Sequence, residues 1–254
     1  MRRIVKTEAV CLRQRRWRES SKVVTLLTQE IGIITGIAKG ARRPQSPLGP
    51  SLNLFAHSQL VLYLARTGDM CTLTDAELIS THSGIALDPN RLVAASQIAE
   101  FLLNTLAPHH PEMRIFKLLV TYLSAIENAS TPSLQPLLLS FLLKALTFLG
   151  YKPELNHCLR CRSPISETAN FNIARGGVVC ATCLPKETTS RTYPLTIDQI
   201  NLLKSLLHTP AAEIAQKFET QLNQQIPGII INLINHHFHP KKFPSLQPLL
   251  RSEK

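Results

Sequence analysis

Short apolar stretches with alternating or β-branched residues fill the first eighty residues of the chain. Such stretches are typical of strands, because successive side chains of a strand point to opposite faces. Five of them follow one another, a number that suits a small barrel. The predicted strands are Ile4–Leu12, Lys22–Thr28, Gly32–Ala38, Ser58–Ala65 and Cys71–Leu78.

The connections between these strands carry the residues that turns require. The stretch TQEIG ends at Gly32 and RTGD covers Arg66–Asp69, so each is predicted as a hairpin connection in which glycine tolerates a positive φ. The longer connection ARRPQSPLGPSL holds three prolines within seven residues. Because proline has no N–H to donate to a neighbouring strand, this stretch is predicted as an exposed loop.

From Asn90 onward the apolar residues recur with the period of helices. Three helices are predicted before residue 150, over Arg91–Leu106, Met113–Glu127 and Pro132–Leu149. In the third, Thr131 is the expected N-cap, Pro132 takes the first helical position and Gly150 ends the helix. This helix has so little polar face that we expect it in the centre of the core, with Lys144 reaching its edge.

Further helices are predicted after a cysteine-rich segment. Thr196 and Gln199 have the spacing of a capping box ahead of an apolar run. An amphipathic helix is predicted over Ala211–Gln225 and a short apolar helix over Gly228–Phe238. A run of strands followed by a run of helices indicates an α+β multidomain fold, with a β-barrel first and an all-α part later.

Positive charge is concentrated at the start of the chain. The 254 residues carry a formal net charge of +11 and have a pI near 9.7, which favours an anionic partner. Residues 1–43 hold eleven Lys or Arg against three Glu, a net charge of +8, so the other 211 residues carry only +3. The 44% hydrophobic content can supply a core for two domains or one large one.

No segment has the pattern of a signal peptide or a membrane span. Lys6 and Glu8 interrupt the apolar stretch that a signal peptide needs, and the richest apolar segment, Leu134–Leu149, is too short to cross a bilayer. We therefore predict a cytoplasmic protein. In a reducing compartment cysteine pairs are more often metal ligands than disulfides, and the lone Cys11 and Cys71 are predicted to be small buried apolar residues.

Four of the six cysteines stand in two Cys-x-x-Cys pairs, Cys158/Cys161 and Cys180/Cys183, separated by eighteen residues. This spacing is typical of a four-thiolate zinc site. The alternative is two disulfides or four unrelated thiols. A catalytic zinc would keep an open position, and a deaminase would need a His-x-Glu ahead of a Pro-Cys-x-x-Cys, a combination that is absent. We therefore predict one structural Zn²⁺, whose binding supplies on the order of 10 kcal/mol to a segment too small to fold alone.

Two basic stretches, RQRRWRES and KGARR, are candidates for contact with nucleic acid. Phosphates attract arginines, and an exposed aromatic ring can stack on a base. The functional interpretation is a cationic groove on the barrel; in the alternative, Trp17 fills the barrel end and the arginines are merely solvated. The candidate DNA-binding residues are Arg13, Arg15, Arg16, Trp17, Arg18, Lys22, Lys39, Arg42 and Arg43.

Other chemistry has little support in the sequence, and no enzyme activity is predicted. The stretch GIAKG lacks the spacing of a phosphate-binding loop. Asp69, Asp75 and Glu77 are the nearest approach to an acidic cluster, but turn and helix-start positions explain them better than Mg²⁺ binding. The run His236–His239 is explained better as a solvated helix end than as a metal site.

Several segments in the same order resemble the DNA repair protein RecO family of bacterial recombination mediators. They are KVVTLLTQEIGIITGIAKGARR, LNLFAHSQLVLYLARTGDMCTLTDAEL, FLLKALTFLGYKPELNHCLRC and GGVVCATC. The resemblance covers nearly the whole chain, and its most specific parts are the KGARR loop and the junction from Gly-Tyr-x-Pro to the first cysteine pair. It implies an N-terminal OB-fold over residues 1–80 and a helical domain over 81–254, with a zinc ribbon inserted at about 155–186.

The resemblance also implies a function without enzymatic turnover. Members of the family bind single- and double-stranded DNA, anneal complementary strands and, with RecR, help RecA displace single-strand-binding protein. The implied partners are therefore DNA, RecR, the acidic C-terminal tail of single-strand-binding protein and, indirectly, RecA. The implied location is cytoplasmic and nucleoid-associated, with no membrane partner.

By position, Lys39, Arg42 and Arg43 match the basic loop of the family, and the four paired cysteines match its zinc ligands. Ser20 and Ser21 stand where many members carry acidic residues, which leaves open whether the surface around Lys22 is more basic and more DNA-facing than usual. Two other classes stay open from the residues alone. An RNA-binding OB and zinc-ribbon protein of translation or transcription would fit the same charge and cysteines, and a zinc hydrolase is a more distant third.

Overall fold

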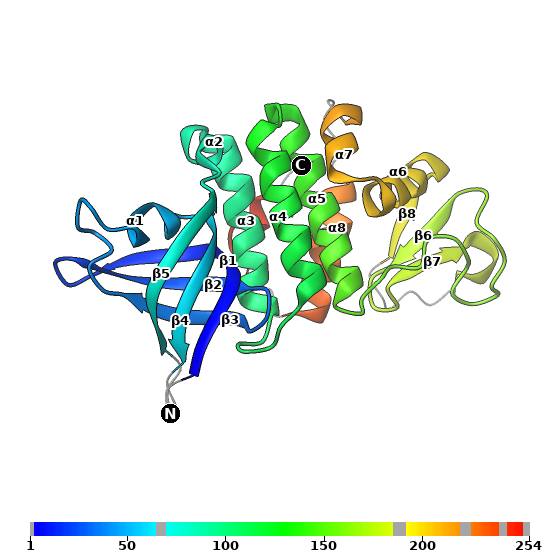
Figure 1. Ribbon diagram of the computed structural model, residues 1–254. Helices are drawn as coiled ribbons and strands as arrows, with labels where there is room; N and C mark the ends of the chain where they lie inside the picture. Colours follow the sequence, from blue (N-terminus) through cyan, green and yellow to red (C-terminus); the bar gives the residue numbers. More distant parts are fainter. Residues whose placement is uncertain (1–2, 65–69, 185–191, 219–224, 239–242, 251–254) are drawn as a thin grey trace. The chain divides into compact units, whose positions relative to one another are not determined.

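The computed structural model describes residues 3–64, 70–184, 192–218, 225–238 and 243–250. The chain divides into two compact units, Met1–Asn128 and Ala129–Lys254. The first unit holds the five longest strands and the helices up to residue 128, and the second holds the remaining helices and a small sheet (Figure 1). The change from strands to helices near residue 80 lies inside the first unit, and the domain boundary expected there stays a prediction.

The five strands of the first unit close into a barrel in the order β1-β2-β3-β5-β4. Strands β3 and β5 are parallel, and the other neighbours are antiparallel. The predicted OB-like barrel is thereby confirmed. The strands are β1 (Arg3–Trp17), β2 (Ser21–Thr28), β3 (Gly32–Ala38), β4 (His57–Leu64) and β5 (Met70–Ser80).

Inward-pointing side chains of these strands form a continuous apolar core, because alternate residues of a strand share a face. Val24 and Leu26 of β2 and Leu60 of β4 are among its most buried members. Cys11 and Cys71 also lie in this core, which confirms that they are small buried residues. Burial raises the pKa of Cys11 to about 12 and that of Cys71 to about 11, so both stay neutral thiols.

Strand β1 continues five residues beyond its predicted end at Leu12 and stops at Trp17. A bulge between Cys11 and Arg13 bends the strand at this point. Before the bulge β1 pairs with both β4 and β2, whereas Arg13–Trp17 pairs only with β2 in the described register. The extension escaped prediction because a run of arginines lacks the apolar alternation by which strands are recognised.

The connection from β3 to β4 is only partly the exposed loop that its prolines predict. It contains one helical turn, α1 (Leu48–Ser51), and Leu48 and Leu52 are buried in the barrel core. The turn TQEIG is confirmed: Gly32 has φ +81°, and a Cβ there would lie 2.2 Å from the carbonyl oxygen of His110. The second predicted turn, RTGD, lies outside the described residues.

Three helices follow the barrel in the first unit: α2 (Ser83–Leu87), α3 (Pro89–Thr105) and α4 (Met113–Asn128). Asp88 caps α3 by accepting from the backbone N–H groups of Asn90 and Arg91, so the helix starts two residues earlier than predicted. The carboxylate of Glu127 on α4 accepts from the Nδ1 of His82 and from the backbone N–H of Gly84, both at 2.9 Å. These bonds attach α2 to α4.

Helix α5 (Thr131–Phe148) is the central helix of the second unit, as predicted, and contacts three others. Its N-cap is Ser130 and not Thr131, which takes the first helical position instead. Lys144 is half-buried and its Nζ donates to the carbonyl oxygen of Thr209 at 2.5 Å, which confirms its place at the helix edge. The partners of α5 are α6 (Ile197–His208), α7 (Ala211–Lys217) and α8 (Gln225–His237).

The helix predicted over Ala211–Gln225 ends early, at Lys217, with Phe218 as its C-cap. Gln225, the predicted end of this helix, is instead the first residue of α8. The predicted capping box at α6 is confirmed. The hydroxyl of Thr196 accepts from the backbone N–H of Gln199, whose side-chain carbonyl accepts from the backbone N–H of Thr196.

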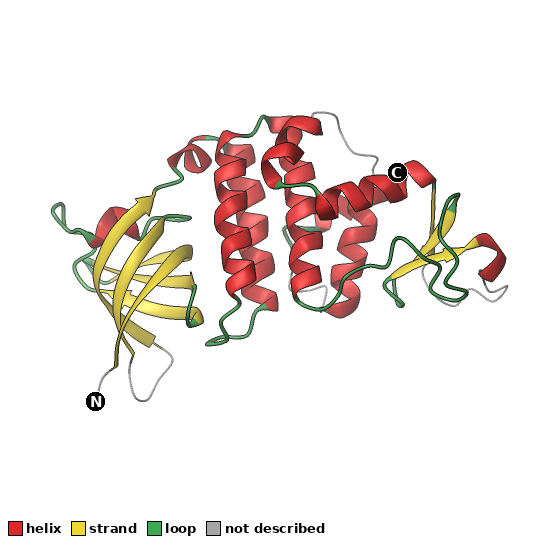
Figure 2. Ribbon diagram, turned by 45° about the vertical axis from the view of Figure 1, so that its right-hand side comes forward, coloured by secondary structure: helices red, strands yellow, loops and turns green. Residues whose placement is uncertain are grey.

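A small three-stranded sheet in the order β7-β6-β8 lies between α5 and α6 in the chain (Figure 2). Its strands are β6 (Ala169–Asn172), β7 (Gly177–Cys180) and β8 (Thr192–Leu195). Together with the preceding loop they form the cysteine segment, defined here as residues 154–184 and 192–195. Among the described residues, no helix is both long enough and apolar enough to cross a membrane.

Candidate metal centre and nucleic-acid interface

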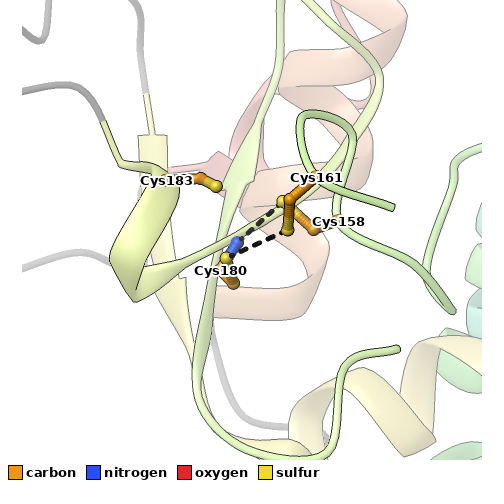
Figure 3. Close-up of side chains that lie close together, drawn as sticks. All are labelled: Cys158, Cys161, Cys180 and Cys183. Atoms are coloured by element: carbon orange, nitrogen blue, oxygen red, sulfur yellow. Dashed lines mark hydrogen bonds between the residues drawn. The ribbon is translucent and has the colours of Figure 1, made fainter. Parts of the chain in front are cut away.

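The four paired cysteines come together from two separate turns (Figure 3). Cys158 and Cys161 lie in the loop before β6, Cys180 ends β7, and Cys183 ends a short 3₁₀ helix. Their Sγ atoms all lie within 4.8 Å of one another, and those of Cys161 and Cys180 are 3.8 Å apart. In the part of the chain that the structure describes, this is the one such group of potential metal ligands.

Backbone pairing holds the two cysteine turns side by side. The N–H of Val178 donates to the carbonyl oxygen of Glu154 at 3.0 Å, and the N–H of Leu159 donates to the carbonyl oxygen of Val178 at 2.9 Å. A Cβ at Gly177 would lie 2.7 Å from the carbonyl oxygen of Glu154, so this close approach requires glycine. Gly177 therefore lies at the point where the two turns meet.

The sulfurs differ in how readily they lose a proton. Burial raises the pKa of Cys158, but hydrogen bonds from backbone N–H groups, including those of Arg160 and Cys180, outweigh this effect and lower the pKa to about 6. Hydrogen bonding to the neighbouring sulfurs raises the pKa of Cys183 to about 12. Without a cation the cluster therefore resists carrying four thiolates at once, whereas a bound divalent cation would favour all four.

The spacing of the sulfurs fits a tetrahedral metal ion. With Zn–S bonds of about 2.3 Å, tetrahedral geometry places the sulfurs about 3.8 Å apart, close to the 3.8 Å between Cys161 and Cys180. A set of four thiolates fills every position of such an ion and leaves none for substrate. The cluster is thus placed to bind a metal ion in a structural role.

Two hollows lie beside the barrel, on either side of Lys39 and Arg43. The first, here called the turn pocket, has a volume of about 860 Å³ and is bordered by the β1–β2 turn, including Trp17 and Ser21. The second, the loop pocket, has a volume of about 520 Å³ and is bordered by residues 44–48. Lys39, Gly40 and Arg43 line both. No pattern in the sequence predicted the loop pocket, since its walls come from a proline-rich connection.

Two of the predicted DNA-binding cations are used to hold the loops in place. The Nη1 of Arg42 donates to the carbonyl oxygen of Glu19 at 2.8 Å, across the gap between the two basic stretches. The Nζ of Lys22 donates to the carbonyl oxygen of Gly49 at 3.3 Å and to the Oδ1 of Asn53 at 3.1 Å. Burial lowers the pKa of Lys22, with a smaller contribution from the charge of Arg42.

The other predicted cations are exposed and make no ion pair within the described residues. Their charges are therefore available to a ligand. The structure does not bring all of them together. Lys39, Arg43 and Arg18 border the turn pocket, whereas the remaining three lie along strand β1. The six exposed cations are Arg13, Arg15, Arg16, Arg18, Lys39 and Arg43.

Trp17 is 42% exposed and lies outside the barrel core, so it does not fill the barrel end. The guanidinium carbon of Arg15 lies 5.7 Å from the centre of the Trp17 ring.

The acidic residues considered as a possible Mg²⁺ site gain no support from the structure. Asp75 and Glu77 are exposed within strand β5, so the turn or helix-start position expected for them was wrong, and they belong to no ligand cluster in the described residues. Asp69 lies outside those residues.

The described histidines at the end of α8 pack partly against an aromatic ring, and they belong to no ligand cluster among the described residues. Tyr151 stacks on His237 with the ring centres 4.1 Å apart. Burial lowers the pKa of His237, with a smaller effect from the charge of His236. His236 is exposed, and His239 lies outside the described residues.

An OB-like barrel bordered by exposed cations, together with a four-cysteine cluster placed to bind a metal ion, defines a nucleic-acid-binding class of protein. Two family models match the chain: Recombination protein O N terminal over residues 1–82 and Recombination protein O C terminal over residues 86–247. The chain is also 36% identical over 187 residues to the DNA repair protein RecO of Nocardioides sp. (strain ATCC BAA-499 / JS614), covering 71% of this chain and 74% of that relative.

The chain therefore belongs to the recombination protein O, or RecO, family. This confirms the resemblance that the sequence suggested and assigns the protein to DNA binding, DNA repair and recombination. It also favours DNA over the RNA alternative. The members of the family are mediators and not enzymes, in agreement with the four-thiolate cluster, which leaves no open metal position.

Proposed function

We propose that this protein is a recombination mediator that binds single- and double-stranded DNA and anneals complementary strands. The observation that carries the proposal is the pair Lys39 and Arg43, which are exposed, make no ion pair within the described residues and line two adjoining pockets. Cations in this state attract phosphates without first breaking bonds of their own. Annealing follows because two polyanionic strands are brought together on one cationic surface.

In this proposal the eight predicted cations have two different roles. Lys39, Arg43 and the exposed arginines of β1 and its turn contact phosphates, whereas Lys22 and Arg42 position the loops that carry them. The net charge of +8 over residues 1–43 supports DNA contact at the N-terminal region. One Zn²⁺, bound by Cys158, Cys161, Cys180 and Cys183, keeps the cysteine segment folded and takes no part in chemistry.

The further partners come from the family. The protein works with RecR to help RecA load on DNA that is coated with single-strand-binding protein. The helical domain, proposed to span residues 81–254, binds the acidic tail of single-strand-binding protein. DNA as a partner supports a cytoplasmic, nucleoid-associated location.

The test is the annealing of complementary oligonucleotides coated with single-strand-binding protein. The variant Lys39→Ala/Arg43→Ala is expected to lose most of the annealing activity. The control is Lys117→Ala/Arg175→Ala, which removes the same charge from two exposed positions outside the barrel and should leave activity intact. Unchanged annealing by the first variant, or equal loss in both, would place the DNA site elsewhere.

A second measurement follows the salt dependence of binding. If about five phosphates are contacted, the slope of log K against log salt on single strands is about −3.5, from about −0.7 per phosphate. Loss of Lys39 and Arg43 should make the slope about 1.4 units shallower. Competition between single-stranded DNA and RNA completes the test, since a preference for RNA would support the alternative class.

A further inference from the structure

Trp17 exposes its indole ring on the outer face of the barrel. The β1–β2 register pairs Gln14 with Val24, and Val24 points into the barrel core. Because faces alternate along a strand, Arg15 and Trp17 lie on the opposite, outward face. Ile37 pairs with Val23, the partner of Arg15, and so belongs to the same outward face.

The turn pocket combines this ring with an apolar side chain and positive charge. It is bordered by Trp17 and Ile37 and also by Lys39 and Arg43. Its volume of about 860 Å³ lies in the range of roughly 300–1,000 Å³ found for small-ligand sites. An aromatic surface beside two unpaired cations matches a nucleotide, which offers a flat base and a phosphate.

We infer that the turn pocket binds one unpaired nucleobase against Trp17, with the flanking phosphate on Lys39 and Arg43. Bases within a duplex already stack on one another and have no free face to offer, so the indole contributes only to single strands. The pocket thus gives the barrel a preference for single-stranded over double-stranded DNA. The inference rests on the proposed function, since it takes DNA to be the ligand of these cations.

The chain contains a single tryptophan, so its tryptophan fluorescence, excited selectively over that of tyrosine, reports on this pocket alone. Titration with a single-stranded oligonucleotide is expected to quench the fluorescence strongly, and titration with a duplex of the same length to quench it much less. Binding of both ligands is followed in parallel by anisotropy of labelled DNA. Strong binding of single strands without quenching would overturn the inference.

Substitution separates stacking from charge. Trp17→Ala is expected to weaken single-strand binding by about five- to hundredfold, the range for loss of one base–aromatic stack, and to leave duplex binding unchanged. Trp17→Phe should keep most of the single-strand affinity. Lys117→Ala, at an exposed cation outside the barrel, is the control that should retain wild-type quenching. Equal losses on single strands and duplex in Trp17→Ala would show a structural role and contradict the inference.

Failure of the inference differs from failure of the proposed function. If Lys39→Ala/Arg43→Ala weakens both ligands and Trp17→Ala weakens neither, the cationic site stands and only the base pocket is wrong. If Lys39→Ala/Arg43→Ala weakens neither ligand, the proposed site itself is wrong, and the inference falls with it. Thermal unfolding of each variant shows whether the barrel is intact.

Discussion

The barrel and the cysteine segment are both built from strands, yet they bury very different amounts of apolar surface. The barrel strands are seven to fifteen residues long and enclose a continuous core. Each strand of the cysteine segment has four residues. Because buried apolar area is the main stabilising term in folding, the barrel can be stable without crosslinks, whereas the segment is expected to need a bound metal ion. Stability has a different source in each region.

Removal of the metal gives the largest expected effect. Cys180→Ser, or a strong chelator, should unfold the cysteine segment, because binding of a structural zinc contributes on the order of 10 kcal/mol. The barrel should stay folded. Limited proteolysis with mass spectrometry should place the new cleavage sites within residues 154–195, and metal analysis should show the loss of one ion per chain.

Cys71→Ala is the matched control, since it removes a thiol from the barrel core and not from the cluster. It should keep the metal and the protease resistance of the segment. A Cys180→Ser variant that still held one zinc per chain and resisted protease as well as wild type would contradict the metal assignment.

A truncation in the barrel core should have the opposite pattern. Leu26 is 1% exposed and lies among the core residues, so Leu26→Ala is expected to cost about 2–5 kcal/mol in the free energy of unfolding. The metal content should not change. Ile4→Ala on the same barrel, at a position 60% exposed, should cost less than about 0.5 kcal/mol. Denaturant unfolding followed by circular dichroism measures both, and equal effects would contradict the assigned core.

Adjacent arginines of the basic loop offer a finer test of what stabilises the first unit. Arg42→Ala removes the hydrogen bond to the carbonyl oxygen of Glu19 and should cost about 1 kcal/mol. Arg43→Ala, which loses no hydrogen bond or ion pair in the described residues, should be within about 0.5 kcal/mol of wild type. For DNA binding we expect Arg43→Ala to have the larger effect, because the charge of Arg43 is free to contact phosphate. Melting curves measure the effect of each variant on stability, and anisotropy titrations measure its effect on DNA affinity.

The metal cluster was predictable from spacing, because two Cys-x-x-Cys turns determine the geometry locally and need only one hairpin to meet. The closed barrel was likewise evident in the alternation of its five strands. The extension of β1 to Trp17 could not be predicted. The arginine-rich part of this strand pairs with β2 alone and lacks the alternating apolar residues by which a strand is recognised. The one-turn helix α1 was not predicted, because the prolines in and around it indicate a loop.

The division of the cations into bound and free could not come from the sequence. Lys39, Arg42 and Arg43 look alike in the string KGARR, yet only Arg42 reaches the carbonyl oxygen of Glu19. That contact depends on how the β1–β2 turn and the loop after β3 approach each other, a long-range property of the barrel. Local sequence patterns therefore identify which segments are basic. The tertiary structure determines which of their cations are free to contact a ligand.

The smallest effect expected concerns pH. Burial raises the pKa of Glu127, but hydrogen bonds from the Gly84 N–H and from His82 outweigh this effect, so the pKa lies below its usual value of 4.5. A depressed folded-state pKa contributes stability that is present above the unfolded-state pKa and lost as pH falls through the folded-state value. Glu127→Gln should therefore destabilise the first unit by about 1 kcal/mol or less at pH 6, and the difference should vanish toward pH 3.

Urea unfolding of both proteins at several pH values between 3 and 6 measures this convergence. Glu77→Gln, at an exposed residue of β5 outside this network, controls for the loss of one negative charge. A constant difference between wild type and Glu127→Gln across the range would mean that packing, and not ionisation, explains the effect. Convergence would instead assign part of the acid response of the first unit to the link between α2 and α4. The cysteine segment is expected to have its own acid response, because protons would compete with a bound metal for the thiolates.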